Sequence, residues 1–138
     1  MDERIKTLAK QLVHHSCRLQ KGEKVLISCH GVHPIPLVKA LIKEIYAVEA
    51  IPFVELSTNS IERELLLGAT AEQQKLMAEV DSMRMKQMDA YIGVRGEYNL
   101  AEESDVPGDK LSLQTRLYSK PVHHDIRVPY TKWVVLRY

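Results

Sequence analysis

Four short apolar runs, each separated from the next by at least one helical pattern, limit the folds open to this chain. One run, Asp89 to Gly96 (DAYIGVRG), holds β-branched and aromatic residues between an aspartate and a glycine, which is typical of a buried strand. The other runs are Lys24 to Ser28 (KVLIS), Ala50 to Glu55 (AIPFVE) and Lys132 to Leu136 (KWVVL). Strands that alternate with helices join through crossover connections into parallel sheets. The pattern therefore predicts an α/β fold, an open and mainly parallel sheet of about four strands with helices on its faces.

The first half of the chain predicts two helices and an edge strand. Asp2 suits the cap of a first helix, whose apolar positions follow one helical face until Lys21 and Gly22 end it. Pro36 suits the first turn of a second helix, where a missing amide hydrogen costs nothing. Pro52 lies near the start of the second strand, where a central position would tolerate it poorly. We therefore expect this strand at an edge of the sheet or at a bulge.

The second half predicts three further helices. Ser60 to Leu67 forms a short one, and Thr70 with Gln73 has the form of a capping box that opens the next. Asp109 to Leu117 is a modest helix, which we expect Pro121 to break. The helix after Thr70 has a methionine-rich apolar side, which we expect to pack in the core as such stripes usually do. Its members are Leu76, Met77, Val80, Met83 and Met88.

The loop after DAYIGVRG, residues 97–108, is long for a connection between a strand and a helix. It collects four carboxylates, and long loops inside compact domains are often functional. In open α/β sheets, ligands bind outside the carboxyl ends of the strands. We therefore expect Arg95, Glu97 and Asn99 to face a ligand. The alternative is ordinary loop chemistry, because Asp105 ahead of a Pro-Gly pair suits a turn and solvated carboxylates are common on loops.

Composition and charge give no reason to propose nucleic acid or a membrane as partner. The 138 residues fit one domain, and 19 basic residues against 18 acidic ones give a net charge of +1. No apolar run approaches the roughly 20 residues of a membrane-spanning helix, and the first residues lack the pattern of a signal peptide. We therefore expect a cytoplasmic protein. Cys17 and Cys29 lack a zinc-type spacing, which favours two buried or partly buried thiols over a disulfide or a metal site.

The six histidines form three close pairs, none with the spacing of a helical zinc site. His30 and His33 lie in a loop with Pro34 directly after, where a third ligand would have to come from Cys29 or from far away. Loop histidines that hydrogen-bond or stay in solvent are the more common case, so we assign no metal ligand. The sequence also lacks a GxGxxG fingerprint, a GxSxG elbow and a Walker lysine. No catalytic residue is therefore assigned from the residues alone.

The chain ends on WVVLRY, residues 133–138, which has the pattern of a buried strand with nothing after it. A self-contained α/β domain would normally cover such a strand with a following helix or close the sheet. We therefore expect this chain to be the front part of a longer protein.

Several blocks of the sequence resemble a known enzyme family. They are GEKVLI at 22–27, ERELLLGATAEQQKLM at 62–77, MKQMDAYIGVRGEYNLAEESDVPGDKL at 85–111 and PVHHDIRVPYTKWVVLRY at 121–138. In these blocks the chain resembles the N-terminal part of the thermophilic metalloaminopeptidases, the aminopeptidase T and aminopeptidase S group. The resemblance covers nearly the whole chain, and several blocks are too long for chance similarity.

The resemblance implies an enzyme that removes N-terminal residues from peptides with two divalent metal ions of the zinc or cobalt type. It also implies a cytoplasmic homodimer with an N-terminal domain of the α/β class. In that family the metal ligands and the general acid/base carboxylate lie in the C-terminal half, beyond Tyr138 of this chain. No catalytic or metal-binding residue is therefore carried over, and this chain holds no metal ion of its own. We expect residues 1–138 to be a non-catalytic N-terminal domain, inactive without the missing catalytic domain through which the enzyme meets its peptide substrate.

Two hypotheses of other kinds stay open beside the resemblance. The chain can be a stand-alone module that binds a small ligand in the crevice above Arg95, although the missing phosphate-binding glycines count against a nucleotide. It can also be an interaction domain, because an uncovered WVVLRY strand can pair with another copy along its exposed edge.

Overall fold

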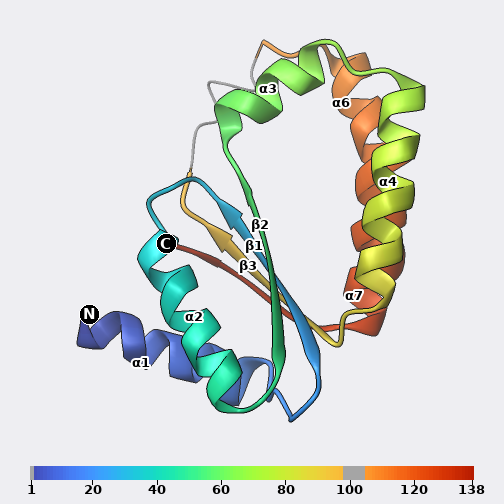
Figure 1. Cartoon of the computed structure of the whole chain (residues 1–138). Helices are drawn as coiled ribbons and strands as arrows, with labels where there is room; N and C mark the ends of the chain where they lie inside the picture. Colours follow the sequence, from blue (N-terminus) through green and yellow to red (C-terminus); the bar gives the residue numbers. More distant parts are fainter. Residues whose placement is uncertain (1, 98–104) are drawn as a thin grey trace.

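The sheet has four parallel strands. The computed structural model describes residues 2–97 and 105–138. Within these residues the strands lie in the order β2-β1-β3-β4, and each neighbouring pair is parallel (Figure 1). The strands are β1 (Lys24–His30), β2 (Ile51–Ser57), β3 (Ala90–Arg95) and β4 (Lys132–Arg137). The predicted α/β fold with an open parallel sheet is confirmed, and every predicted strand lies where the sequence placed it.

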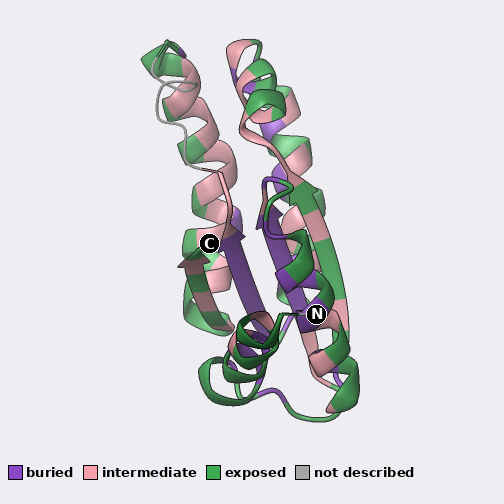
Figure 2. Ribbon diagram, turned by 90° about the vertical axis from the view of Figure 1, so that its left-hand side faces the viewer, coloured by how far each residue is buried: buried purple, intermediate pink, exposed green. Residues whose placement is uncertain are grey.

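The two central strands are buried and the two outer strands are partly exposed. β1 and β3 are buried almost from end to end, whereas most residues of β2 reach solvent (Figure 2). The edge position predicted from Pro52 is confirmed, because β2 pairs only with β1. β4 was expected to be buried, and this is wrong: its residues alternate between half-buried and exposed. As an edge strand it packs Val134 and Leu136 against the core and leaves Trp133 and Val135 at the surface.

One face of the sheet is covered by the first helices of the chain. They are α1 (Glu3–Gln11), the π-helical segment η1 (Leu12–Ser16) and α2 (Ile35–Ala47). Asp2 caps α1 as predicted, since its Oδ1 accepts a hydrogen bond from the Arg4 amide at 2.8 Å. Helical structure ends at Ser16, before the predicted stop at Lys21, and Arg18 then takes a left-handed conformation with φ 45°. Cys17 and Cys29 are buried here as free thiols, as predicted.

The other face is covered by two long helical segments that lie side by side. After α3 (Asn59–Leu67) the chain forms α4 (Ala71–Lys86), and later α6 (Gly108–Gln114), the π-helical η2 (Thr115–Arg127) and the short α7 (Val128–Tyr130) (Figure 1). Thr70 caps α4 as predicted, accepting from the Gln73 amide. A second core joins the sheet to this layer through Leu26, Tyr91, Ala78, Met85, Met88 and Val122.

The expectation that the methionine-rich side packs in the core is wrong for most of its members, although Met88, just past the end of α4, is buried in this second core. Leu76, Val80 and Met83 are 60%, 53% and 65% exposed. The helix instead turns Gln74, Ala78 and Met85 inward, toward η2 and the sheet. The small Ala78 lets η2 approach closely, and this tertiary contact outweighs the apolar stripe that the sequence displays.

Pro121 does not break the last helix, which is a second correction. The helical path continues from Gly108 through Pro121 to Tyr130, as α6, η2 and α7. A proline disrupts an α-helix because its ring meets the carbonyl of the preceding turn, and the wider turns of a π-helix relieve that contact. None of the described helices, even along this path, is long and apolar enough to cross a membrane.

Candidate functional site

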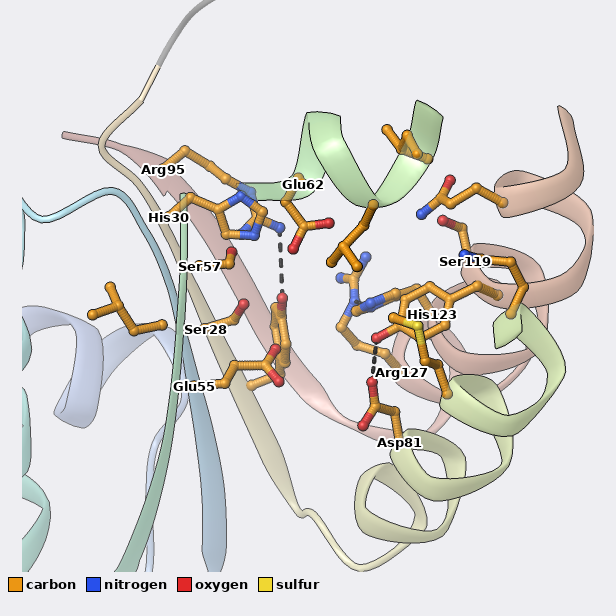
Figure 3. A pocket seen from close by; sticks show the side chains of 18 residues that line it. Ser28, His30, Glu55, Ser57, Glu62, Asp81, Arg95, Ser119, His123 and Arg127 are labelled. Carbon is orange, nitrogen blue, oxygen red and sulfur yellow. Dashed lines mark hydrogen bonds between the residues drawn. The ribbon is translucent and has the colours of Figure 1, made fainter. Parts of the chain in front are cut away.

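A cavity of about 530 Å³ lies between the second face of the sheet and the helical layer (Figure 3). The strands β1, β2 and β3 form one wall, and α3, α4, α6 and η2 form the other. A volume of this size suits a small organic ligand. Its charged and imidazole side chains are His30, Glu55, Glu62, Asp81, Arg95, His123 and Arg127.

The cavity lies where the chain reverses its direction across the sheet. From β1 the chain crosses by α2 on one face to β2, and it returns by α3 and α4 on the other face to β3. β1 and β3 are neighbours in the sheet, but the chain leaves β1 toward β2 at one edge and leaves β3 toward β4 at the other edge. Such a switch point opens a crevice at the carboxyl ends of the two strands. His30 and Arg95 are the last register partners of these two strands, and both line the cavity.

Both histidines of the cavity are held neutral. Burial, assisted by the nearby positive charge of Arg95, lowers the pKa of His30 from 6.5 to about 4. Burial together with Arg127 and Arg95 lowers the pKa of His123 to about 4 as well. The negative charge of Glu97 raises the pKa of His30, and that of Asp81 raises the pKa of His123. Neither carboxylate outweighs the combined effect of burial and arginine. At neutral pH the positive charge around these imidazoles therefore comes from arginine alone.

Arg127 is fixed by aromatic rings and by one of the histidines. Its guanidinium carbon lies 4.8 Å from the centre of the Tyr91 ring and 4.9 Å from that of Trp133. Its Nε donates a hydrogen bond to Nδ1 of His123 at 2.8 Å. Cation–π contacts favour a guanidinium over an ammonium in such a position. On the strand side, Arg95 reaches the same Tyr91, whose hydroxyl lies 3.5 Å from Nη2 of Arg95. The two arginines thus converge on one tyrosine.

Two of the carboxylates in the cavity wall are already bound. Glu55 forms an ion pair with Arg84 across the β2 and α4 elements. Asp81 accepts a hydrogen bond from the hydroxyl of Tyr118, and burial together with this carboxylate raises the pKa of that hydroxyl well above its usual range. Glu55 and Asp81 thus each have a partner of their own, Arg84 and the Tyr118 hydroxyl.

The three residues expected to face a ligand have different positions. Arg95 lies in the cavity wall. Glu97 lies beyond it, where its Oε2 accepts a hydrogen bond from the Asn59 amide at 2.5 Å and so caps α3. Asn99 lies outside the described residues. Ligand binding by any of them stays a prediction.

Sequence reasoning missed the helical wall of the cavity. His123 was considered only with its neighbour His124, but the chain directs His123 inward and leaves the His124 side chain 79% exposed. The spacing of His123 and Arg127, four residues apart in a helical segment, places them on one face and was the available signal. Nothing in the sequence alone showed that this face meets the end of β3.

The residues present do not fit a two-metal site. No group of three or more His, Cys, Asp or Glu side chains within residues 2–97 and 105–138 is placed to hold a metal ion. His30 and His33, the pair considered from the sequence, diverge: His30 lines the cavity, and the His33 ring lies 5.3 Å from that of Tyr138. The positive charge of the nearby Arg95 also opposes a cation at His30.

Comparison with known proteins supplies the family. The family model described as thermophilic metalloprotease (M29) matches residues 1–138, the whole chain. The chain belongs to the M29 family. The fold of this M29 chain is similar to that of wild-type AmpT from Thermus thermophilus, with a TM-score of 0.72 and 19% sequence identity. The match covers 97% of this chain and 35% of that one, so the M29 chain spans about a third of its structural neighbour. A search of curated proteins found no match.

Proposed function

We propose that this chain is the N-terminal, non-catalytic α/β domain of an M29 aminopeptidase, an enzyme that removes N-terminal residues from peptides. The observation that carries the proposal is the family match over residues 1–138. The share of AmpT that the chain spans leaves about two thirds of such a protein to supply the two zinc or cobalt ions and the acid/base carboxylate. In this proposal the present domain shapes the access of peptides to that site and is inactive alone.

The described side chains support a non-catalytic role. Metal-dependent peptide hydrolysis needs ligands that hold the ions and an open position for water. Within the described part of the chain no three candidate ligands converge, and the cavity wall holds Arg95 and Arg127 together with the carboxylates of Glu55, Glu62 and Asp81. This lack of a converging ligand set supports a binding role for the cavity rather than a hydrolytic metal centre.

Equilibrium dialysis of the purified 138-residue chain against zinc or cobalt tests this proposal. We expect no stoichiometric ion with a dissociation constant below about 1 μM, because residues 2–97 and 105–138 present no preformed ligand set. His15→Gln serves as a control for loose binding to exposed histidines. An ion held at one per chain, and released by His30→Gln or His123→Gln, would contradict the proposal.

A cytoplasmic homodimer is also part of the proposal. The exposed apolar side chains on the edge strands β2 and β4 support subunit contacts, since edge strands pair readily with other chains. Sedimentation equilibrium over a wide range of concentration measures this directly. We expect a dimer that Phe53→Lys on β2 weakens, whereas a strict monomer at the highest concentration would contradict this part.

A further inference from the structure

We propose that the cavity between β1, β3 and the α4–η2 layer binds a small carboxylate, such as the free carboxylate of an amino acid or short peptide, between Arg95 and Arg127. This inference stands apart from the proposed function, because binding needs neither a metal ion nor turnover. It rests on hydrogen-bonding groups in the cavity wall and on the balance of charge around them.

Unpaired buried polar atoms gather at this cavity. Among the described residues, four buried side-chain nitrogen or oxygen atoms have no hydrogen-bond partner. Three belong to residues of the cavity wall: Nη1 of Arg95, Nη1 of Arg127 and Oε1 of Gln74. The fourth is Nε of Arg84, the arginine that pairs with Glu55. Because a buried polar atom without a partner is costly, three of them at one cavity point to a ligand.

The unpaired atoms specify the chemistry of that ligand. Two guanidinium N–H groups require an acceptor, and a planar carboxylate matches guanidinium geometry. The Gln74 oxygen requires a donor, which the N–H of an amino acid or peptide supplies. Gln74 is only 3% exposed, so water outside the cavity cannot serve it. A ligand with a carboxylate and a nearby N–H group carries both kinds of partner that these three atoms lack.

The charge balance favours a singly charged anion over phosphate. Arg95 and Arg127 carry the positive charge of the cavity, because His30 and His123 are neutral. The same wall holds the carboxylate of Asp81, which accepts a hydrogen bond from the neutral hydroxyl of Tyr118 and would repel a second negative charge. Leu65, Leu66 and Met77 add apolar surface for the body of the ligand. These features suit an organic carboxylate with a short apolar side chain.

Calorimetric titration of the whole chain with N-acetylleucine, at neutral pH and without metal, tests the proposal. N-acetylleucinamide, which is neutral and of the same shape, and inorganic phosphate are the comparison ligands. We expect saturable binding of N-acetylleucine at one site and at least roughly tenfold weaker binding of the other two, as expected for the loss of charged hydrogen bonds. No binding, equal binding of the amide, or tighter binding of phosphate would each overturn it.

Variants locate the site. Arg95→Gln and Arg127→Gln should each weaken binding of N-acetylleucine by roughly tenfold or more. Arg116→Gln is the matched control, because Arg116 is an exposed arginine of the same segment η2 that does not line the cavity. Unchanged affinity in both cavity variants would overturn the proposal, and so would an equal loss in the Arg116 variant.

A signal from the unmodified chain keeps the test independent of whether these variants fold. A carboxylate bound at Arg95 would offset the positive charge that lowers the pKa of His30 and His123. Saturating N-acetylleucine should therefore move the NMR titration midpoints of these two histidines upward, and at constant pH it should leave the ring signals of the exposed His15 unchanged. Unmoved midpoints for both cavity histidines under saturation would overturn the placement of the ligand.

Discussion

His30 and His123 make the stability of the fold depend on pH. Each has a pKa of about 4 in the folded chain, against 6.5 without the protein environment. Between these values the unfolded chain binds protons that the folded chain does not, so the free energy of unfolding falls as the pH falls from 6.5 toward 4. Above that window both states are neutral at these sites, and the histidines add no pH dependence.

His30→Gln should therefore reduce the loss of stability on acidification. We expect the drop in melting temperature between about pH 7 and about pH 4.5 to be smaller in this variant than in the unmodified chain. His15→Gln, at an exposed histidine of η1, should leave the drop unchanged. Thermal melts at the two pH values measure the difference. An identical drop in all three proteins would show that His30 is not held neutral by its surroundings.

Gly96 is required by the close approach of a neighbouring loop. A Cβ added there would lie 2.2 Å from Cγ of Pro34 and 2.9 Å from the backbone oxygen of His30. The Gly96 amide also donates to that oxygen at 2.8 Å, so the backbone cannot move away without losing this bond. Space at this position therefore limits the residue to glycine.

Gly96→Ala should lower the free energy of unfolding by about 1–3 kcal/mol, the usual cost of overpacking. Gly108→Ala is the matched control, because a Cβ at Gly108 meets no atom within 4 Å. Urea unfolding of the two variants measures both effects. A Gly96 variant as stable as the Gly108 variant would contradict the close contact with Pro34.

At the level of whole elements, α4 exposes most of the apolar side that its sequence pattern predicts to be buried. Met83 is 65% exposed, and Met85, two residues along the same helix, is 2% exposed. The outer side carries the larger apolar residues, yet the inner side packs against η2 and Tyr91. The choice of side thus depends on the partner that covers the helix rather than on its own hydrophobicity.

A pair of glutamine substitutions tests this orientation. Met85→Gln should cost about 2–4 kcal/mol, because it replaces a buried thioether with an amide that lacks partners. Met83→Gln should change the free energy of unfolding by less than about 0.5 kcal/mol, as exposed substitutions usually do. Urea unfolding followed by circular dichroism separates the two. Similar costs at both positions would mean that the methionine-rich side of α4 is covered.

Elements with a local signal were predictable from the sequence, and those that depend on distant partners were not. Pro52 predicted an edge strand because proline has no backbone N–H to donate to a neighbouring strand, whatever surrounds it in the fold. Asp2 and Thr70 predicted helix starts because each caps the amide of a residue close by. The prediction that Pro121 breaks the helix was wrong because the width of the helical turn around it depends on how η2 packs on α4.

The same distinction explains how much of the cavity could be foreseen. Arg95 was found because it is the last residue of β3, at the end where α/β folds bind ligands. Gln74 lies on the crossover from β2 to β3, and His123 and Arg127 lie on the crossover from β3 to β4. The order of the strands in the sheet places these side chains at the cavity, and the spacing of residues within one helix does not predict that order.

At the scale of the whole molecule, the chain combines an M29 family match with a parallel sheet whose crevice holds two arginines, Arg95 and Arg127. The fold is that of AmpT over about a third of the AmpT chain. The strand order and the crossovers on opposite faces form a crevice at the carboxyl ends of β1 and β3. From these features we propose a domain that binds and positions peptides and does not itself hydrolyse them.

Hydrolysis of a leucine anilide by the purified chain, its mass confirmed as 15.8 kDa and with zinc or cobalt added, tests this claim most directly. We expect no turnover above that of a sample heated to unfold it, because the described residues hold no set of metal ligands. Turnover that grows in proportion to the chain, and that His30→Gln abolishes while His15→Gln preserves, would contradict the claim and place a catalytic centre in the cavity.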